Sequence, residues 1–273
     1  MANARKSTVK PVIAGPDTRL DKVDPASTCG FAGDKASSEA LRAGHIARLA
    51  QLQDVLYAQQ KHPVLVVFQA MDTGGKDGVV RYVFSGLNPQ GVHVKSFKAP
   101  SEEELSHDYL WRIHPFAPAK GRIAVFNRSH YEDVVITRVH GWISAAQCKR
   151  RYRHINDFER MLVEEGTTIV KFFLHISRDE QRKRLQARLD APDKRWKFNP
   201  ADLAEREHWD DYMAAYQDAL RATSQDRAPW YIVPSDKKWL RDLYVAKVLV
   251  DTLEALDLRY PDPPPGLDKL VVR

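Results

Sequence analysis

Short apolar runs recur along the middle of the chain, and each is bounded by polar or turn-forming residues. Most of them are nearly continuous in Val, Ile, Leu and Phe, which is typical of strands buried on both faces of a parallel sheet. One further segment alternates apolar and polar positions, which is also typical of a strand. The pattern therefore predicts five strands, over residues 64–68, 92–97, 121–127, 168–176 and 230–233.

Helical periodicity fills the intervals between these runs. Leu49, Leu52 and Leu56, for example, lie on one face of a predicted helix. Capping-box patterns at 101–104 and 144–147 mark the starts of two others. The predicted helices cover residues 37–60, the turns after 76, and about 101–115, 144–162, 177–189, 200–223 and 237–256.

The alternation of buried strands with helices predicts an α/β fold, with a parallel five-stranded sheet and helices on both faces. No repeat or linker divides the chain, so we expect a single domain over residues 37–260 with a helical insertion at about 178–210. Residues 1–36 lack periodicity, which predicts an arm lying over the surface. Residues 261–273 begin with several prolines and are expected to form an extended tail.

The first predicted strand runs directly into a turn that carries Gly74, Gly75 and Lys76, and a helical pattern follows. In a phosphate-binding loop, backbone N–H groups and the helix N-terminus hold the anion while a lysine adds positive charge. The segment departs from the usual G-x-x-x-x-G-K-[ST] pattern at Ala70 and at Asp77. Its strand–turn–helix context favours phosphate binding over the alternative, an ordinary glycine-rich turn.

Acidic and amide side chains follow the first and third predicted strands. Because ligands of open α/β sheets bind at the carboxyl ends of the strands, we expect these side chains to meet at one site. Oxygen ligands of this kind suit one or two Mg²⁺ ions, although any one of the residues alone could be a cap or turn residue. The group comprises Asp72, Asp77, Asn127, Glu132 and Asp133.

Two sets of basic residues could contact phosphates. Arg128 directly follows the third strand, where a guanidinium stabilises a transferring phosphoryl group; a salt bridge to Asp133 is the alternative. The second set lies between residues 178 and 197, and its position predicts a lid over the phosphates. A solvated charged helix has the same composition. The residues of this set that we assign to phosphate binding are Arg178, Arg182, Arg188, Lys194 and Lys197.

Composition narrows the class of protein. The net charge of +6 indicates a polyanionic partner or a generally basic surface. No run approaches the roughly 18 apolar residues of a membrane span, and the N-terminal residues lack the apolar centre of a signal peptide. The two cysteines and ten histidines form no redox or metal motif, so we predict a reduced, cytoplasmic setting and no membrane partner.

Four motifs together resemble the polyphosphate kinase 2 family. They are Ala-Met-Asp-Thr-Gly-Gly-Lys-Asp (70–77), Phe-Asn-Arg-Ser-His-Tyr-Glu-Asp (126–133), Ala-Arg-Leu-Asp-Ala-Pro-Asp-Lys-Arg-Trp-Lys-Phe (187–198) and Ala-Pro-Trp-Tyr-Ile-Val-Pro (228–234). The resemblance runs from about residue 40 to 260. The second motif resembles that of the class III subfamily, whose members phosphorylate both nucleoside mono- and diphosphates.

The resemblance implies a P-loop kinase-like fold, similar to that of thymidylate kinases, with a helical lid. It also implies phosphoryl transfer between inorganic polyphosphate and the nucleotides AMP and ADP. The cofactor would be Mg²⁺, with Mn²⁺ as an alternative, and the assembly a dimer or tetramer. Many relatives carry Asp where this chain has Asn127, and Glu132 stands where relatives restricted to one phosphorylation step usually carry Asn.

Matching the motifs residue by residue gives the predicted roles. Catalysis is assigned to Asp72, Lys76, Asn127, Arg128 and Glu132, and the metal site to Asp72, Asn127 and Asp133. Phosphate binding is assigned to Gly74, Gly75, Lys76, Asp77 and Arg128, together with the basic set at 178–197. Nucleotide binding is assigned to Arg81, Lys98, Arg112, Glu132 and Asp133.

Two other functions fit parts of the pattern. An ATP-dependent nucleotide or small-molecule kinase would share the fold and the loop, and would use ATP as its only donor. A nucleic-acid-binding protein could use the basic clusters at 149–153 and 178–197. However, the chain has no helix-turn-helix, zinc or RNA-binding motif, so no nucleic-acid partner is expected.

Overall fold

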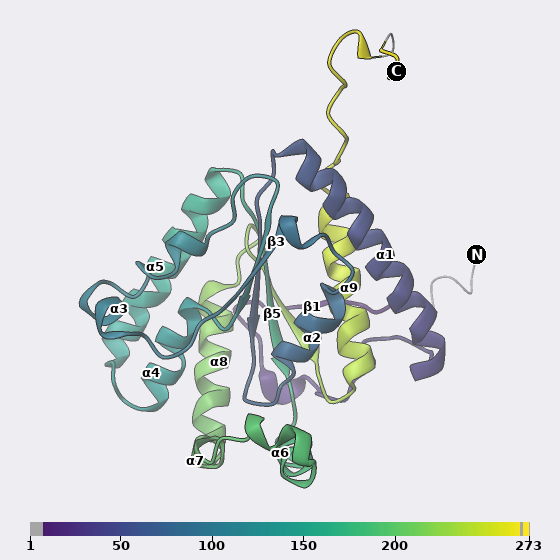
Figure 1. Ribbon diagram of the computed structural model, residues 1–273. Coiled ribbons are helices and arrows are strands. Elements are labelled where there is room, and N and C mark those ends of the chain that lie inside the picture. Colours follow the sequence, from purple (N-terminus) through teal and green to yellow (C-terminus); the bar gives the residue numbers. More distant parts are fainter. Residues whose placement is uncertain (1–7, 268–269, 273) are drawn as a thin grey trace.

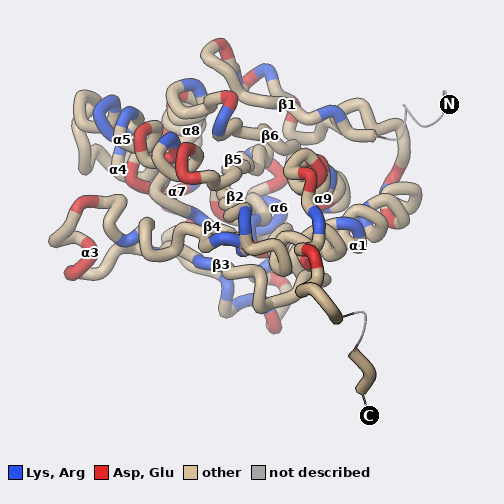
Figure 2. Tube along the Cα trace, turned by 90° about the horizontal axis from the view of Figure 1, so that it is seen from above, with Lys and Arg blue, Asp and Glu red and all other residues tan. Residues whose placement is uncertain are grey.

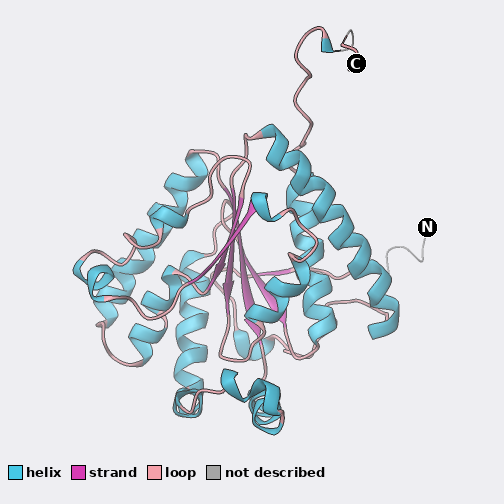
Figure 3. Ribbon diagram, viewed as in Figure 1, coloured by secondary structure: helices cyan, strands magenta, loops and turns pink. Residues whose placement is uncertain are grey.

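The computed structural model describes residues 8–267 and 270–272. Within them, six strands form one sheet in the order β1-β6-β5-β2-β4-β3. Neighbouring strands are parallel except at the β1–β6 edge. Figure 3 shows this sheet between two groups of helices. The strands are β1 (Val12–Ile13), β2 (Val64–Gln69), β3 (Val92–Ser96), β4 (Ile123–Asn127), β5 (Thr168–His175) and β6 (Trp230–Pro234).

The prediction of five strands was wrong by one, because the N-terminal arm supplies the edge strand β1. Val12 pairs with Ile232 and Ile13 with Tyr231, in antiparallel register. A two-residue strand has no periodicity of its own, and it forms only because β6 offers an open edge. The arm is packed against the body elsewhere too, since Leu20 is 4% exposed and Phe31 is 3% exposed. Residues 1–7 of the predicted arm lie outside the described residues.

Helices cover both faces of the sheet (Figure 1). Alternate residues of β2 explain this, since Val66 packs in the core under α1, α2 and α9, while Val67 packs in the core under α5 and α8. The longer helices are α1 (Lys35–Gln59), α2 (Lys76–Val83), α5 (Ala145–Glu164), α6 (Arg178–Asp190), α8 (Trp209–Thr223) and α9 (Lys238–Glu254). Shorter ones are α3 (Glu102–Ser106), α4 (Ile136–Val139) and α7 (Ala201–Glu207).

Two predicted helices differ from the structure. The helix expected over 101–115 ends at Ser106. The chain turns there because the Asp108 carboxylate accepts hydrogen bonds from the backbone N–H groups of Leu110 and Trp111. The helix expected over 200–223 is divided into α7 and α8 at His208. The remaining predicted strand and helix boundaries agree with the structure to within a few residues.

The chain ends in a tail that leaves the body beyond α9 (Figure 1). Residues 261–266 are exposed and form neither helix nor strand. Residues 268–269 and 273 of the predicted extended tail lie outside the described residues. Among the helices of the described residues, none is both long enough and apolar enough to cross a membrane.

Candidate active site

The turn after β2 joins that strand directly to the N-terminus of α2, an arrangement in which backbone N–H groups can bind an anion. Gly75 adopts a left-handed φ of 109°, and α2 begins at the next residue, Lys76. The Lys76 ammonium group is buried and donates to the carbonyls of Ala70 at 2.7 Å and Met71 at 3.4 Å. Burial, and next the positive charge of Arg128, lowers the pKa of Lys76. The lysine therefore lies inside the loop, where an arriving anion would compensate its charge.

Two side-chain contacts join this loop to the end of β4. Arg128 Nη2 donates to Asp72 Oδ1 at 2.8 Å, and Asn127 Nδ2 donates to Asp77 Oδ1 at 2.6 Å. Arg128 has a φ of 63° and its N–H donates to the Phe68 carbonyl, so the backbone turns there and aims the guanidinium at the loop. The alternative of an Arg128–Asp133 salt bridge was wrong, because the partner is Asp72.

Acidic residues around Arg128 set its electrostatics. Although burial opposes the shift, the carboxylates of Glu132 and Asp72 raise the pKa of Arg128 above its ordinary value. The same two carboxylates, after burial, contribute to the raised pKa of Tyr216 on α8. Asp72, Arg128, Glu132 and Tyr216 thus lie near one another, as expected for the first three.

Asp133 lies in a different environment from the other predicted metal ligands. Burial raises the pKa of Asp133 to about 6, against the opposing charges of Arg112 and Arg151. Its Oδ2 atom is buried and has no hydrogen-bond partner among the described residues. It lines a cavity of about 370 Å³ whose other lining residues include Glu104, Tyr109, Arg112, Arg151 and His154.

Three residues predicted to bind nucleotide have different degrees of exposure. Arg81 and Lys98 are exposed. Arg112 is only 6% exposed and donates to the carboxylate of Glu104 and to the carbonyl of Lys98. Arg112 therefore fixes the segment after β3, and it also lines the Asp133 cavity.

The predicted basic lid residues lie on α6 and on the 3₁₀ helix η6 (Pro192–Lys197). Arg178, Arg182, Lys194 and Lys197 are exposed, and Arg188 donates to the Lys197 carbonyl at 3.3 Å. Figure 1 shows α6 and α7 together at one end of the molecule, and Figure 2 shows basic residues near α6 and β4. The same segment also contains buried residues that contact the turn after β2.

Sequence reasoning did not assign Gln181, Arg184 or Arg241, and all three contact the loop. Gln181 and Arg184 on α6 donate to loop carbonyls. Arg241 on α9 lies so close to Gly75 that a Cβ there would meet its Nη1 atom at 1.9 Å. Arg184 stands inside the basic run and has no feature in the sequence that separates it from its exposed neighbours. Only the structure distinguishes Arg184 from these neighbours, since it is 9% exposed.

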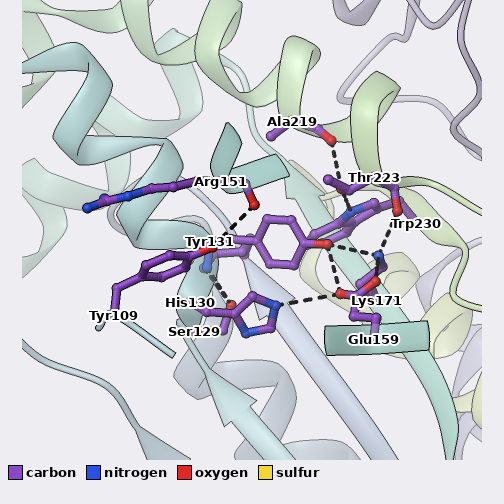
Figure 4. A network of polar contacts seen from close by, with 11 residues as sticks. Tyr109, Ser129, His130, Tyr131, Arg151, Glu159, Lys171, Ala219, Thr223 and Trp230 are labelled. Atoms are coloured by element: carbon purple, nitrogen blue, oxygen red, sulfur yellow. Dashed lines mark hydrogen bonds and ion pairs between the residues drawn. The ribbon is translucent and has the colours of Figure 1, made fainter. Parts of the chain in front are cut away.

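A buried polar network supports the segment that carries Arg128 and Glu132 (Figure 4). Lys171 Nζ on β5 donates to Glu159 Oε2 on α5 at 2.6 Å and to the Tyr131 hydroxyl at 2.9 Å. Tyr131, in the 3₁₀ helix η5 (His130–Val134), donates in turn to Glu159 Oε1. Burial lowers the pKa of Lys171, while its charge helps to keep the pKa of Glu159 below the ordinary value in spite of burial.

The residues around the loop fit a magnesium ion better than a metal held by protein alone. Among the described residues, no group of three or more His, Cys, Asp or Glu side chains is arranged to hold a metal. Mg²⁺ is usually bound by one or two carboxylates, with phosphate and water oxygens completing its octahedron. Asp72 and Asp77 supply such carboxylates, and each uses one oxygen in its contact with the β4 end.

These features define an α/β protein in which a lysine, an arginine and two carboxylates meet at the turn after β2, at the carboxyl end of the sheet. Residues 33–261 match the family model Polyphosphate kinase 2 (PPK2). The chain therefore belongs to the polyphosphate kinase 2 family, and the predicted resemblance is confirmed.

Individual relatives agree with this membership. The AMP/ADP-polyphosphate phosphotransferase of Meiothermus ruber is 53% identical over 259 residues, which are 94% of this chain and 97% of the relative. The ADP-polyphosphate phosphotransferase of Rhodopseudomonas palustris is 49% identical over 91% of this chain and 88% of the relative. The crystal structure of Polyphosphate Kinase 2 from Arthrobacter aurescens TC1 superposes with a TM-score of 0.90 at 48% identity, covering 96% of this chain and 97% of that one.

Proposed function

We propose that this protein is a polyphosphate-dependent nucleotide kinase that converts AMP to ADP and ADP to ATP, reversibly, with inorganic polyphosphate as the donor. The observation that carries the proposal is the contact between the segments that follow β2 and β4. Arg128, after β4, donates a hydrogen bond to Asp72, after β2, beside the buried Lys76. Such a site gathers positive charge around a phosphate and provides carboxylates for its metal. The Meiothermus ruber relative is an AMP/ADP-polyphosphate phosphotransferase, which supports both acceptors.

The reaction moves one phosphoryl group between phosphates. The terminal phosphoanhydride bond of polyphosphate breaks, a phosphate oxygen of AMP or ADP bonds to the transferred phosphorus, and polyphosphate shorter by one unit leaves. The attacking oxygen is already ionised at neutral pH, so the reaction needs no general base. Catalysis then consists of orientation and charge neutralisation, for which we assign Lys76, Arg128 and the loop N–H groups from Gly75 onward.

Magnesium completes the proposed site. Asp72 and Asp77 would hold the ion, with the amide oxygen of Asn127 as a further ligand, and Mn²⁺ is the alternative ion. When bound, the ion would supply positive charge that neutralises the phosphate oxygens. We leave Asp133 out of this set, because its surroundings are Arg112, Arg151 and the cavity rather than the loop.

The acceptor nucleotide would extend from Glu132 towards the cavity at Asp133. That cavity offers a buried carboxylate oxygen without a partner among the described residues, next to the Tyr109 ring and the Arg151 guanidinium, which lies 4.7 Å from the ring centroid. An acceptor of hydrogen bonds beside an aromatic face suits a nucleobase with an exocyclic amine. Arg81 and Lys98 remain predictions for contact with the phosphates of the acceptor.

The wider predictions belong to the same proposal. Strand, glycine turn, lysine and helix around a mainly parallel sheet support a P-loop kinase-like fold of the thymidylate kinase type. The basic residues of α6 and η6, within 178–210, support a lid over the donor. The division into arm (1–36), catalytic domain (37–260) and tail (261–273), a cytoplasmic setting and assembly as a dimer or tetramer complete the proposal.

The donor is the feature to test. Purified protein with AMP and Mg²⁺ is given polyphosphate, ATP or both, and the nucleotides are separated by chromatography. Polyphosphate alone is expected to support formation of ADP at a rate that ATP does not increase. An ATP-dependent kinase would form ADP from AMP only in the tubes that contain ATP, and that result would replace the proposal with its alternative.

A further inference from the structure

Every carbonyl of the phosphate loop from Ala70 to Gly75 accepts a hydrogen bond from the protein. Lys76 Nζ donates to the carbonyl of residue 70, and the N–H of residue 74 donates to that of residue 71 at 2.9 Å. Helix α6 supplies the donors for the next three carbonyls: Gln181 donates to that of residue 72, and Arg184 to those of residues 73 and 74. The carbonyl of residue 75 accepts the first backbone bond of α2.

Arg184 joins three separate segments through one guanidinium. Its Nη1 atom donates to the Thr73 carbonyl at 3.0 Å, and its Nη2 atom donates to the carbonyls of Ser235 at 2.6 Å and Asp236 at 3.1 Å. Its Nε atom donates to Glu180 at 2.9 Å, which holds the side chain against its own helix. The planar fork of an arginine can make all of these bonds at once, whereas a lysine ammonium cannot.

Gln181 extends the same connection to the neighbouring helix. It is 1% exposed and donates to the Asp72 carbonyl at 3.0 Å. Its Oε1 atom accepts a bond from Arg206 on α7 at 2.8 Å. The loop, α6 and α7 are therefore linked by consecutive side-chain contacts, and none of these contacts uses an N–H group of the loop.

We infer that Gln181 and Arg184 are positioning residues that hold the phosphate loop in its anion-binding conformation. A loop carbonyl left without a donor would turn its negative end towards the site or require a water, and either change weakens the cradle of N–H groups. The inference rests on the proposed function, in which this loop holds the donor polyphosphate. It also divides the predicted lid, because the start of α6 then belongs to the loop's support and the lid role is left to later residues such as Lys194 and Lys197.

The test compares Arg184→Met with a matched control, Arg221→Met. Arg221 also donates to a backbone carbonyl, that of Thr18 at 2.6 Å, but it lies away from the loop. Two quantities are measured for each variant: KM for polyphosphate and for AMP, and the rise in melting temperature caused by polyphosphate alone or by AMP alone. The polyphosphate KM of Arg184→Met is expected to rise about tenfold or more, since several hydrogen bonds act together. Its polyphosphate-induced melting shift should disappear while the AMP-induced shift remains.

Two further variants keep the inference falsifiable. Arg184→Lys retains the charge with fewer donors in reach, so its polyphosphate KM should lie between those of wild type and Arg184→Met; complete rescue would overturn the hydrogen-bonding role. Gln181→Met removes one donor without changing the volume much, and should raise the polyphosphate KM about threefold. It decides the question if Arg184→Met does not fold.

Two outcomes would reduce both residues to structural contacts of α6. In one, the variants change the KM for polyphosphate and the KM for AMP equally; in the other, these changes equal those of Arg221→Met. If the wild-type protein binds polyphosphate but transfers no phosphate, and Arg184→Met selectively loses that binding, the proposed function is contradicted and this inference is not.

Discussion

The side-chain amide of Asn127 donates a hydrogen bond to the carboxylate of Asp77 at 2.6 Å, which connects the end of β4 to the first turn of α2. Many relatives carry Asp at this position, and a second carboxylate at that separation would repel the first unless a cation lay between them. The amide thus holds Asp77 in place without a cation. We therefore expect position 127 to set how strongly the proposed magnesium site depends on its ion.

Asn127→Asp should increase the affinity for Mg²⁺ at a cost to the metal-free protein. The added carboxylate gives the ion a further charged ligand, so the Mg²⁺ concentration for half-maximal activity should fall about tenfold. Without metal, the melting temperature of the variant should be below that of wild type. Titrations of rate and of melting temperature with Mg²⁺ measure both effects. Asn127→Ala serves as the control, and a variant whose Mg²⁺ response equals that of Asn127→Ala would contradict a metal site at Asp77.

Glu132→Asn should change the balance between the two acceptors. Glu132 adds negative charge beside Lys76 and Arg128, and ADP carries more negative charge than AMP. Removing the carboxylate should therefore favour ADP over AMP and raise the ratio of kcat/KM for ADP to that for AMP about tenfold. The two steps are measured separately, each with polyphosphate as donor. An equal loss for both acceptors would remove Glu132 from acceptor selection.

Asp133→Asn should stabilise the protein at high pH more than at low pH. The pKa of Asp133 is about 6 in the folded protein, above its ordinary 3.8, so the folded state binds more protons than the unfolded state between these values. The free energy of unfolding of wild type therefore falls as the pH rises through this window, by up to about 3 kcal/mol in total. The stability gained by Asp133→Asn should be small at pH 4 and larger at pH 8.

Urea unfolding at the two pH values measures this difference. Asp157→Asn, which changes an exposed carboxylate on α5, controls for the general effect of removing a negative charge. A gain at Asp133 that does not depend on pH would show that its carboxylate is not strained by burial.

Removing one partner of the Lys171–Glu159 pair should lower the stability of the protein more than removing both. Lys171→Met leaves the Glu159 carboxylate buried without its cation, which should lower the free energy of unfolding by about 3–5 kcal/mol. The double variant Lys171→Met, Glu159→Leu removes both charges and should recover most of that loss. Denaturant unfolding of the two variants and of Glu159→Leu completes the cycle. Failure of the double variant to exceed both single variants would indicate that the hydrogen bonds to Tyr131, rather than the charges, dominate the network.

Much of the fold could be predicted from the sequence because its central strands are buried on both faces and are therefore mostly apolar, as in 64–69 and 168–175. The strand β1 could not, because two residues carry no period and the pairing depends on the exposed edge of β6. The early end of α3 also depends on a single turn, at Asp108, which a hydrophobic pattern does not record.

The candidate site was predictable where it follows strand ends. Asp72, Lys76, Asn127 and Arg128 could be placed together because parallel strands end at one edge of the sheet. Their pairing could not be predicted. Arg128 contacts Asp72 rather than Asp133 because the backbone at Arg128 makes a left-handed turn, which the sequence does not indicate. Arg184 could not be distinguished from the exposed basic residues of the same run, because burial of one residue in a charged run does not change the composition.

The central claim is most directly tested by following AMP, Mg²⁺ and polyphosphate over time with the purified protein and no ATP. The account predicts that ADP appears first and ATP after a delay, as polyphosphate shortens, and that added salt slows both steps because the donor is a polyanion. Lys76→Ala should keep its fold and lose the activity, with turnover reduced far more than about tenfold. If wild type forms no ADP from AMP and polyphosphate, or if Lys76→Ala retains turnover within about tenfold of wild type, the account is contradicted.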